Sequence, residues 1–166
     1  DPLPTMDYYF HGDLDGSYTL IEDGIDGYSN NTGSNDEGTI KRTYATISNA
    51  ADINSLELMM IKELGSNPSE QDVYDMFETG PTTFSNRTKN GIIINWKDDS
   101  GSIWTTDTRF GSASNSSCVI TQVGTFNGGN KTFEVFGNIN CKLYNLAGQS
   151  KTISNGKFVI QFHPGK

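Results

Sequence analysis

The sequence has few of the residues on which most enzyme and nucleic-acid sites are built. Two histidines and two cysteines occur in 166 residues, and 12 lysines and arginines stand against 20 aspartates and glutamates. At a formal net charge of −8, the chain lacks the clustered cations that bind phosphates, so we expect no nucleic-acid partner. His11 and His163 form no HxH or HExxH spacing, and we expect no metal ion and no cofactor.

Long apolar runs are missing as well. No stretch approaches the roughly 20 residues that a membrane-spanning helix needs, so we expect no transmembrane segment. The sequence has no Gly-x-Ser-x-Gly nucleophile elbow. The acidic residues Asp98, Asp99 and Asp107 could serve as paired carboxylates for glycoside hydrolysis, but a hairpin turn explains the first two equally well. We therefore expect that the protein is not an enzyme.

What the chain has in abundance is glycine, asparagine, serine and threonine. This balance favours strands joined by many turns over a helical bundle. The length suits one core, and neither a linker nor an internal repeat divides the sequence. We predict a single all-β domain over residues 1–166, arranged as a two-sheet antiparallel sandwich or a partly open barrel.

The clearest strand pattern lies near the C-terminus, where two β-rich runs flank Asn127–Asn130. Such a cluster predicts a hairpin. With Gly129–Asn130 as the turn, the predicted facing pairs are Phe126 with Phe133, Gly124 with Val135, Ile120 with Ile139, and Cys118 with Cys141. The same alternation predicts one inward, buried face made of Cys118, Ile120, Phe126, Phe133, Val135, Ile139, Cys141 and Leu143. The two cysteines are then either small buried hydrophobic residues or a cross-strand disulfide, which an oxidising compartment permits.

Similar patterns predict strands elsewhere. Residues 6–21 read as a hairpin with its turn at Asp15–Gly16, or as one long bent strand. Residues 39–48 read as a strand, and residues 91–106 as a further hairpin. The segment Leu56–Leu64 suits helix by propensity, but its alternation and its neighbours favour strand. Residues 23–38 read as a polar loop. After Thr152 the chain predicts one long strand, bulged at Asn155–Gly156.

One short helix is predicted near residues 68–79. Asn67 is a candidate N-cap, Pro68 occupies the first turn, and Glu70 follows three residues after the cap. The apolar residues Val73, Met76 and Phe77 share one face of such a helix. Gly80–Pro81 would end it.

Trp96 and Trp104 lie on the two strands of the hairpin at residues 91–106. Exposed indole rings there would form a binding surface, since aromatic rings stack on sugars. The alternative is that both rings are buried in the core.

Several segments resemble small secreted lipoprotein domains of Bacteroidetes, a family of unknown function. The resemblance rests on Gly-x-Phe at 124–126, Gly-x-Ile-x-Cys-x-Leu at 137–143, Ile-Ser-Asn-Gly-x-Phe at 153–158, and the run from Ile92 to Trp104. It implies an all-β fold and an extracytoplasmic location in the cell envelope, and it implies no activity. A lipid anchor upstream of Asp1 would fit that location.

These observations predict a non-catalytic binding module of the cell envelope, whose partner is a glycan or another ligand. The alternative is an adhesion or assembly subunit that binds an envelope protein through an edge strand. A hydrolase with dispersed carboxylates is the third hypothesis.

Overall fold

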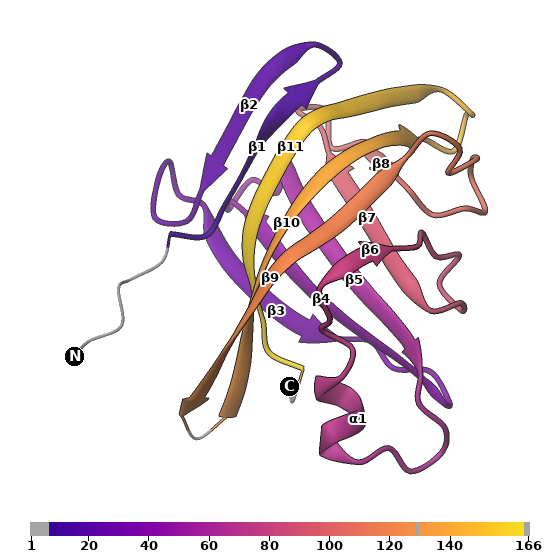
Figure 1. The fold of residues 1–166 in the computed structure, drawn as a ribbon. Coiled ribbons are helices and arrows are strands. Elements are labelled where there is room, and N and C mark those ends of the chain that lie inside the picture. Colours follow the sequence, from indigo (N-terminus) through magenta and orange to yellow (C-terminus); the bar gives the residue numbers. More distant parts are fainter. Residues whose placement is uncertain (1–6, 129, 165–166) are drawn as a thin grey trace.

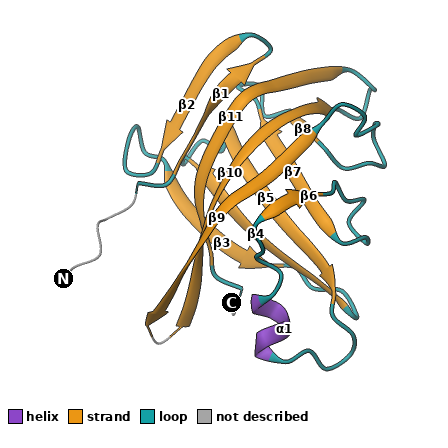
Figure 2. Ribbon diagram, in the orientation of Figure 1, coloured by secondary structure: helices purple, strands orange, loops and turns teal. Residues whose placement is uncertain are grey.

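The computed structural model describes residues 7–128 and 130–164. Strands dominate this part of the chain, and the helix is short (Figure 2). The elements in order are β1 (Tyr9–Leu14), β2 (Ser17–Glu22), β3 (Ser29–Ser34), β4 (Ile40–Ser48), β5 (Ser55–Glu63), α1 (Glu70–Tyr74), β6 (Gly80–Thr82), β7 (Gly91–Lys97), β8 (Ile103–Thr105), β9 (Ser117–Gly128), β10 (Asn130–Tyr144) and β11 (Ser150–Phe162).

All these strands belong to one antiparallel sheet in the order β2-β1-β11-β10-β8-β7-β5-β4-β3, with β9 on β10 and β6 on β9. The sheet curls until β3 reaches β11 (Figure 1). The Asn30 carboxamide closes the seam: it donates to the carbonyl oxygen of Gln161 and accepts from the N–H of Gln161, both at 3.0 Å. The predicted all-β class is confirmed, and the nearly closed barrel is the form it takes.

Apolar side chains fill the inside of the barrel. On β5 these are Leu56, Leu58 and Met60, and on β7 they are Ile92 and Ile94. Their spacing of two follows from strand geometry, in which alternate side chains point to the same face. The predicted strand over Leu56–Leu64 is therefore confirmed, because burial of one face outweighs the helix propensity of its residues.

The register predicted for the hairpin of β9 and β10 is wrong. Val135 lies opposite Val123 instead of Gly124, and Ile139 lies opposite Cys118 instead of Ile120. The pairing slips between Phe136 and Gly137, where β9 carries one extra residue. A bulge of this kind reverses the face of every later residue relative to a strict alternation. It explains why Val123 packs against the core.

Most of the predicted inward face of that hairpin is nevertheless buried. The buried members are Cys118, Ile120, Phe133, Val135, Ile139, Cys141 and Leu143. Gly129 and the side chain of Phe126 lie outside the described residues. The backbone pairs residue 126 with Thr132, so the predicted partner Phe133 is wrong.

The cysteines are not bonded to each other. Both are free and buried, and Cys118 lies opposite Ile139, so the predicted facing of the two cysteines is wrong. Burial raises the pKa of the Cys118 thiol to about 12, and burial together with Cys118 raises that of Cys141. Both thiols are protonated at neutral pH and act as the small core residues of the other prediction.

The helix is present but shorter than the predicted range. Its N-cap is Ser69 and not Asn67: the Ser69 hydroxyl accepts from the N–H of Asp72, whose carboxylate accepts from the N–H of Ser69. This capping box satisfies two N–H groups of the first turn. The helix ends at Tyr74, and Met76 and Phe77 are buried beyond it.

Two further predictions concern the N-terminal half and the last strand. The loop predicted over residues 23–38 is wrong in part, because β3 occupies Ser29–Ser34 and pairs with β4. The long bulged strand near the C-terminus is confirmed: β11 runs through Asn155, which has a φ of 53°, and its pairing with β10 slips at that point.

Candidate functional site

The two tryptophans lie opposite each other on β7 and β8, and both point into the barrel. Trp96 is 1% exposed and Trp104 8% exposed. Trp96 packs against Phe10, with ring centroids 6.0 Å apart. Neither indole presents an open face for a sugar, so the alternative prediction of buried core rings describes their placement, and a binding surface has to be sought elsewhere.

Asp98 organises the turn between β7 and β8 instead of standing in a cleft. Its Oδ1 accepts from the N–H groups of Ser100 and Ser102, each at 2.9 Å, and its Oδ2 accepts from Trp104 Nε1 at 2.8 Å. Burial raises the pKa of this carboxyl, but the hydrogen bonds outweigh burial and lower it to about 2. A carboxylate committed in this way holds a turn and is poorly suited to proton transfer.

The outside of the barrel carries a second apolar cluster. Met59 and Ile61 on β5 and Ile93 on β7 are buried, although alternation places them opposite the core-facing side chains. The consecutive apolar runs at residues 58–61 and 92–94 therefore supply both faces of these strands. An antiparallel strand that is apolar on both faces needs a second covering layer on its outer side.

That outer face is only partly covered, which leaves a groove of about 290 Å³. We call it the outer groove. Its apolar lining consists of Met59, Ile93, Ile103, Phe110, Tyr144 and Leu146. Its polar lining consists of Arg87, Asn95, Thr105, Asp107 and Arg109.

Three of the apolar side chains that line the outer groove are unusually open to solvent. Ile103 is 55% exposed, Phe110 37% and Leu146 87%. They come from three separate segments: β8, the loop after it, and the turn between β10 and β11. Large apolar side chains that gather from distant parts of a chain mark a contact surface more often than chance exposure does.

Hydrogen bonds hold the walls of the groove in place. The Arg109 guanidinium pairs with the buried Asp107 carboxylate through Nε at 3.0 Å and Nη2 at 2.6 Å. The Tyr144 hydroxyl donates to the Ser112 carbonyl oxygen at 3.0 Å. A Cβ added at Gly111 would stand 2.3 Å from the Tyr144 ring, so glycine allows the loop to lie flat against that ring.

The opposite wall is anchored through Arg42, whose side chain is 3% exposed. Its Nε donates to the Arg87 carbonyl oxygen at 2.9 Å, and its Nη1 donates to Glu37 at 2.9 Å. The loop that carries Arg87 is thereby attached to β4. On the floor, the Asn95 amide donates to Glu57 Oε1 at 2.9 Å. The groove is thus formed before any ligand arrives, which reduces the entropic cost of binding.

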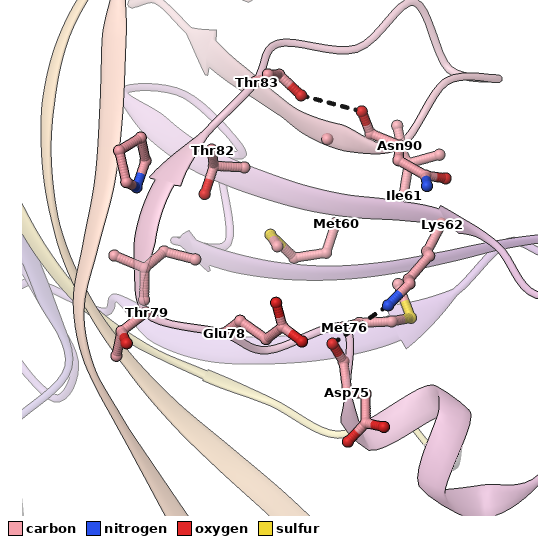
Figure 3. Close-up of a pocket in the computed structure, with 13 residues that line it drawn as sticks. Met60, Ile61, Lys62, Asp75, Met76, Glu78, Thr79, Thr82, Thr83 and Asn90 are labelled. Carbon is pink, nitrogen blue, oxygen red and sulfur yellow. Dashed lines mark hydrogen bonds between the residues drawn. The ribbon is translucent and has the colours of Figure 1, made fainter.

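A second hollow, of about 240 Å³, lies beside α1 where the barrel wall opens between β5 and β6 (Figure 3). Met60, Met76 and Ile120 form its apolar part, and Lys62, Asp75 and Glu78 stand among its polar residues. Lys62 Nζ donates to the Asp75 carbonyl oxygen at 3.4 Å. None of the described residues that line this hollow is aromatic, which distinguishes it from the outer groove.

Other kinds of site were sought in residues 7–128 and 130–164. No group of three or more histidine, cysteine, aspartate or glutamate side chains there could hold a metal ion. In the same ranges no helix is long and apolar enough to cross a membrane.

Comparisons with known proteins add no further constraint. No protein-family model matches the chain, and neither a curated protein nor a solved structure is significantly similar to it. The resemblance to secreted lipoprotein domains therefore stays a prediction, and any function has to be argued from the groove itself.

Sequence reasoning missed the aromatic residues of the groove. Phe110 lies in a Gly/Ser-rich link, and Tyr144 ends β10. Neither stands in a motif. The one sequence signal for the groove was the pair of consecutive apolar runs on β5 and β7. These runs indicate an apolar outer face, but they do not show which loops border it.

Proposed function

We propose that the protein is a non-catalytic binding module of the cell envelope that binds a glycan in the outer groove. The observation that carries the proposal is the combination of ring faces with fixed polar groups. Phe110 and Tyr144 stand beside Asn95, Thr105 and the Asp107–Arg109 pair.

This combination suits a sugar because a pyranose has apolar C–H faces and a rim of hydroxyl groups. An aromatic side chain covers the first, and planar polar side chains hydrogen bond with the second. A hollow of about 290 Å³ is at the small end for ligand pockets, which fits one or two sugar rings at the end of a chain. The envelope location, with a lipid tether upstream of Asp1, is supported by the resemblance to secreted lipoprotein domains.

A glycan array followed by titration calorimetry tests the proposal. We expect binding of one class of glycan by the wild-type protein and at least about fivefold weaker binding by Phe110→Ala, since a stacked ring contributes on the order of 1 kcal/mol. Phe110 is a suitable choice because it is partly exposed, so its truncation should leave the fold intact.

Ile25→Ala is the control, because Ile25 is an exposed apolar side chain in the loop between β2 and β3, outside the groove. It should bind as the wild type does. Absence of binding by the folded wild-type protein, or unchanged affinity in Phe110→Ala, would contradict the proposal. Trp96→Ala and Trp104→Ala are poor tests, because removal of a buried ring unfolds or weakens the barrel whatever the ligand.

A further inference from the structure

The β1–β2 hairpin projects from the barrel, and β2 is an edge strand of the sheet that the described residues form (Figure 1). Within the described residues β2 pairs with β1 alone. The hairpin turns at Asp15 and Gly16, whose φ angles are 49° and 81°, as a two-residue turn of type I′ requires. Its pairing with β1 runs without a register shift from Leu14↔Ser17 to Tyr9↔Glu22.

The register decides which backbone groups of β2 face outward. The N–H of Asp23 donates to the carbonyl oxygen of Tyr8 at 2.8 Å, and hydrogen-bonded pairs alternate along an antiparallel ladder. Thr19 and Ile21 therefore direct their N–H and C=O groups to β1. Tyr18, Leu20 and Glu22 direct theirs to the open edge.

This edge carries none of the usual protections against pairing. Natural edge strands are blunted by lysine, proline, bulges or inward charges. The sequence of β2 is SYTLIE, with one charge at its end and neither proline nor lysine. Tyr18 is 67% exposed and Leu20 51%. An edge with free main-chain groups and exposed apolar side chains is a template for another strand.

We propose that two copies of this chain pair through β2, antiparallel, with Thr19 on the two-fold axis. Residues whose backbone N–H and C=O groups point to the open edge must then pair with each other. Tyr18 of each copy therefore lies opposite Leu20 of the other. The two pairs supply about four main-chain hydrogen bonds and two apolar cross-strand contacts. Glu22 falls opposite Gly16, so no two carboxylates face each other within the paired strands. Asp15 and Asp23 come opposite each other just beyond them, in the turn and the loop that flank β2.

Neighbouring registers are less favourable. An axis at Leu20 places Tyr18 opposite Glu22, and an axis at Tyr18 places Leu20 opposite Gly16, so each loses the Tyr–Leu contacts. The axis at Thr19 is the self-complementary choice, and self-complementarity is what a two-fold interface requires. This argument favours a second copy over a strand from an unrelated protein.

The outer face of the hairpin would become continuous across the axis. Tyr9 and His11 stack with ring centroids 5.5 Å apart, and His11 lies 6.2 Å from Tyr18. Leu20 of the second copy would extend this row of side chains and cover the exposed face of Tyr18. The pairing would join the sheets of the two copies at β2. This contact is separate from the outer groove, which lies over β5, β7 and β8.

Sedimentation analysis at about 100 µM protein tests the pairing, since small interfaces of this kind are weak. We expect a dimer for the wild type and a monomer for Leu20→Lys and Leu20→Pro. The proline removes an N–H that faces outward, so the ladder with β1 stays intact, and circular dichroism verifies folding of both variants. Ile103→Lys, an equally exposed position on β8, should remain dimeric.

Cross-linking tests the register. Two Thr19→Cys residues on the axis form a pair without hydrogen bonds, about 4.5 Å apart at Cα, within the range of a disulfide. We expect a covalent dimer on mild oxidation of Thr19→Cys and none for Tyr18→Cys, while the buried Cys118 and Cys141 stay unreactive. A wild-type monomer, or a dimer that survives Leu20→Lys, would overturn the pairing. Cross-linking through Tyr18→Cys instead would overturn this register.

Discussion

The strands at the two ends of the sheet, β3 and β2, differ in whether their outer edges are hydrogen bonded to another strand. The edge of β3 is joined to β11 through the side chain of Asn30, whose carboxamide hydrogen bonds with both backbone groups of Gln161. The edge of β2 meets no strand within the described residues. A carboxamide has one donor side and one acceptor side, as a peptide group does, so one side chain can replace a missing strand partner.

A second set of contacts reinforces the closed edge. The Tyr8 hydroxyl donates to Glu134 Oε1 at 2.6 Å, and Gln161 Nε2 donates to the Tyr8 oxygen at 3.0 Å. The start of β1 is thereby attached to β10 and β11 at the same level as the seam. Among the described residues the open edge has no comparable side-chain network, and the large side chains of Tyr18 and Leu20 are exposed there. We therefore expect residues of the seam to govern stability and residues of the β2 edge to govern association.

The largest effect is expected from Asn30→Ala. Loss of the carboxamide leaves the N–H and C=O of Gln161 without partners at a partly buried seam, so the free energy of unfolding should fall by about 2–3 kcal/mol in urea denaturation. Asn31→Ala is the control. Among the described residues the Asn31 side chain bonds with Ser29 alone, so its loss should cost under about 0.5 kcal/mol. Equal stability of the two variants would show that the seam does not depend on this side chain.

An intermediate effect is expected at Tyr8. Burial, followed by the hydrogen bond with Glu134 and its charge, raises the pKa of Tyr8 above its ordinary value of about 10. The neutral phenol is thus the form favoured by folding. The stability that the neutral phenol gives to the folded state is fully present below about pH 10. It is lost as the pH rises further, toward the higher pKa of the folded state.

Tyr8→Phe should therefore be less stable than the wild type by about 1.5 kcal/mol at pH 8, the lower end of the range for a hydrogen bond to a charged group, because the site is part-buried. The difference should shrink between pH 10 and 12. Thermal melting of both proteins across that range measures it, and subtraction removes the contribution of the other tyrosines. If the difference in stability between the two proteins stays constant with pH, ionisation of Tyr8 does not affect the stability of the seam, and the prediction is wrong.

The smallest effect on stability is expected at the open edge. Leu20→Lys and Tyr18→Ser should change the free energy of unfolding of the monomer by no more than about 0.5 kcal/mol, because both side chains are exposed. Urea denaturation at high dilution, where the protein is monomeric, checks this. A loss comparable with that of Asn30→Ala would mean that β2 stabilises the barrel as the seam does.

The errors of sequence reasoning concentrate where the sheet departs from regularity. The turn at Asp15–Gly16 and the strand over Leu56–Leu64 follow from local signals, since turn residues and alternation act over a few positions. The register of β9 and β10 was wrong because a bulge inserts one residue, and alternation alone gives no sign of it. The helix cap was misplaced by two residues, since Ser69 with Asp72 competes with the equally plausible Asn67.

The candidate site was the least predictable part. Trp96 and Trp104 belong to the alternating set that faces the core, but their exposure depends on which face of the sheet is enclosed. Phe110 and Tyr144 line the outer groove because β8, the loop after it and the end of β10 meet on the outer face of β5 and β7. Such meetings depend on strand order, which is not encoded in any local pattern.

The sequence by itself determined the all-β class, the positions of most strands and the apolar character of both faces of β5 and β7, because these follow from side-chain spacing along a single strand. Only the tertiary structure decided how the barrel closes, which rings are buried and which edge stays open. β3 shows the difference most clearly: Ser-Asn-Asn-Thr-Gly-Ser has little strand propensity, and it forms a strand because β4 supplies the hydrogen bonds and Asn30 reaches β11.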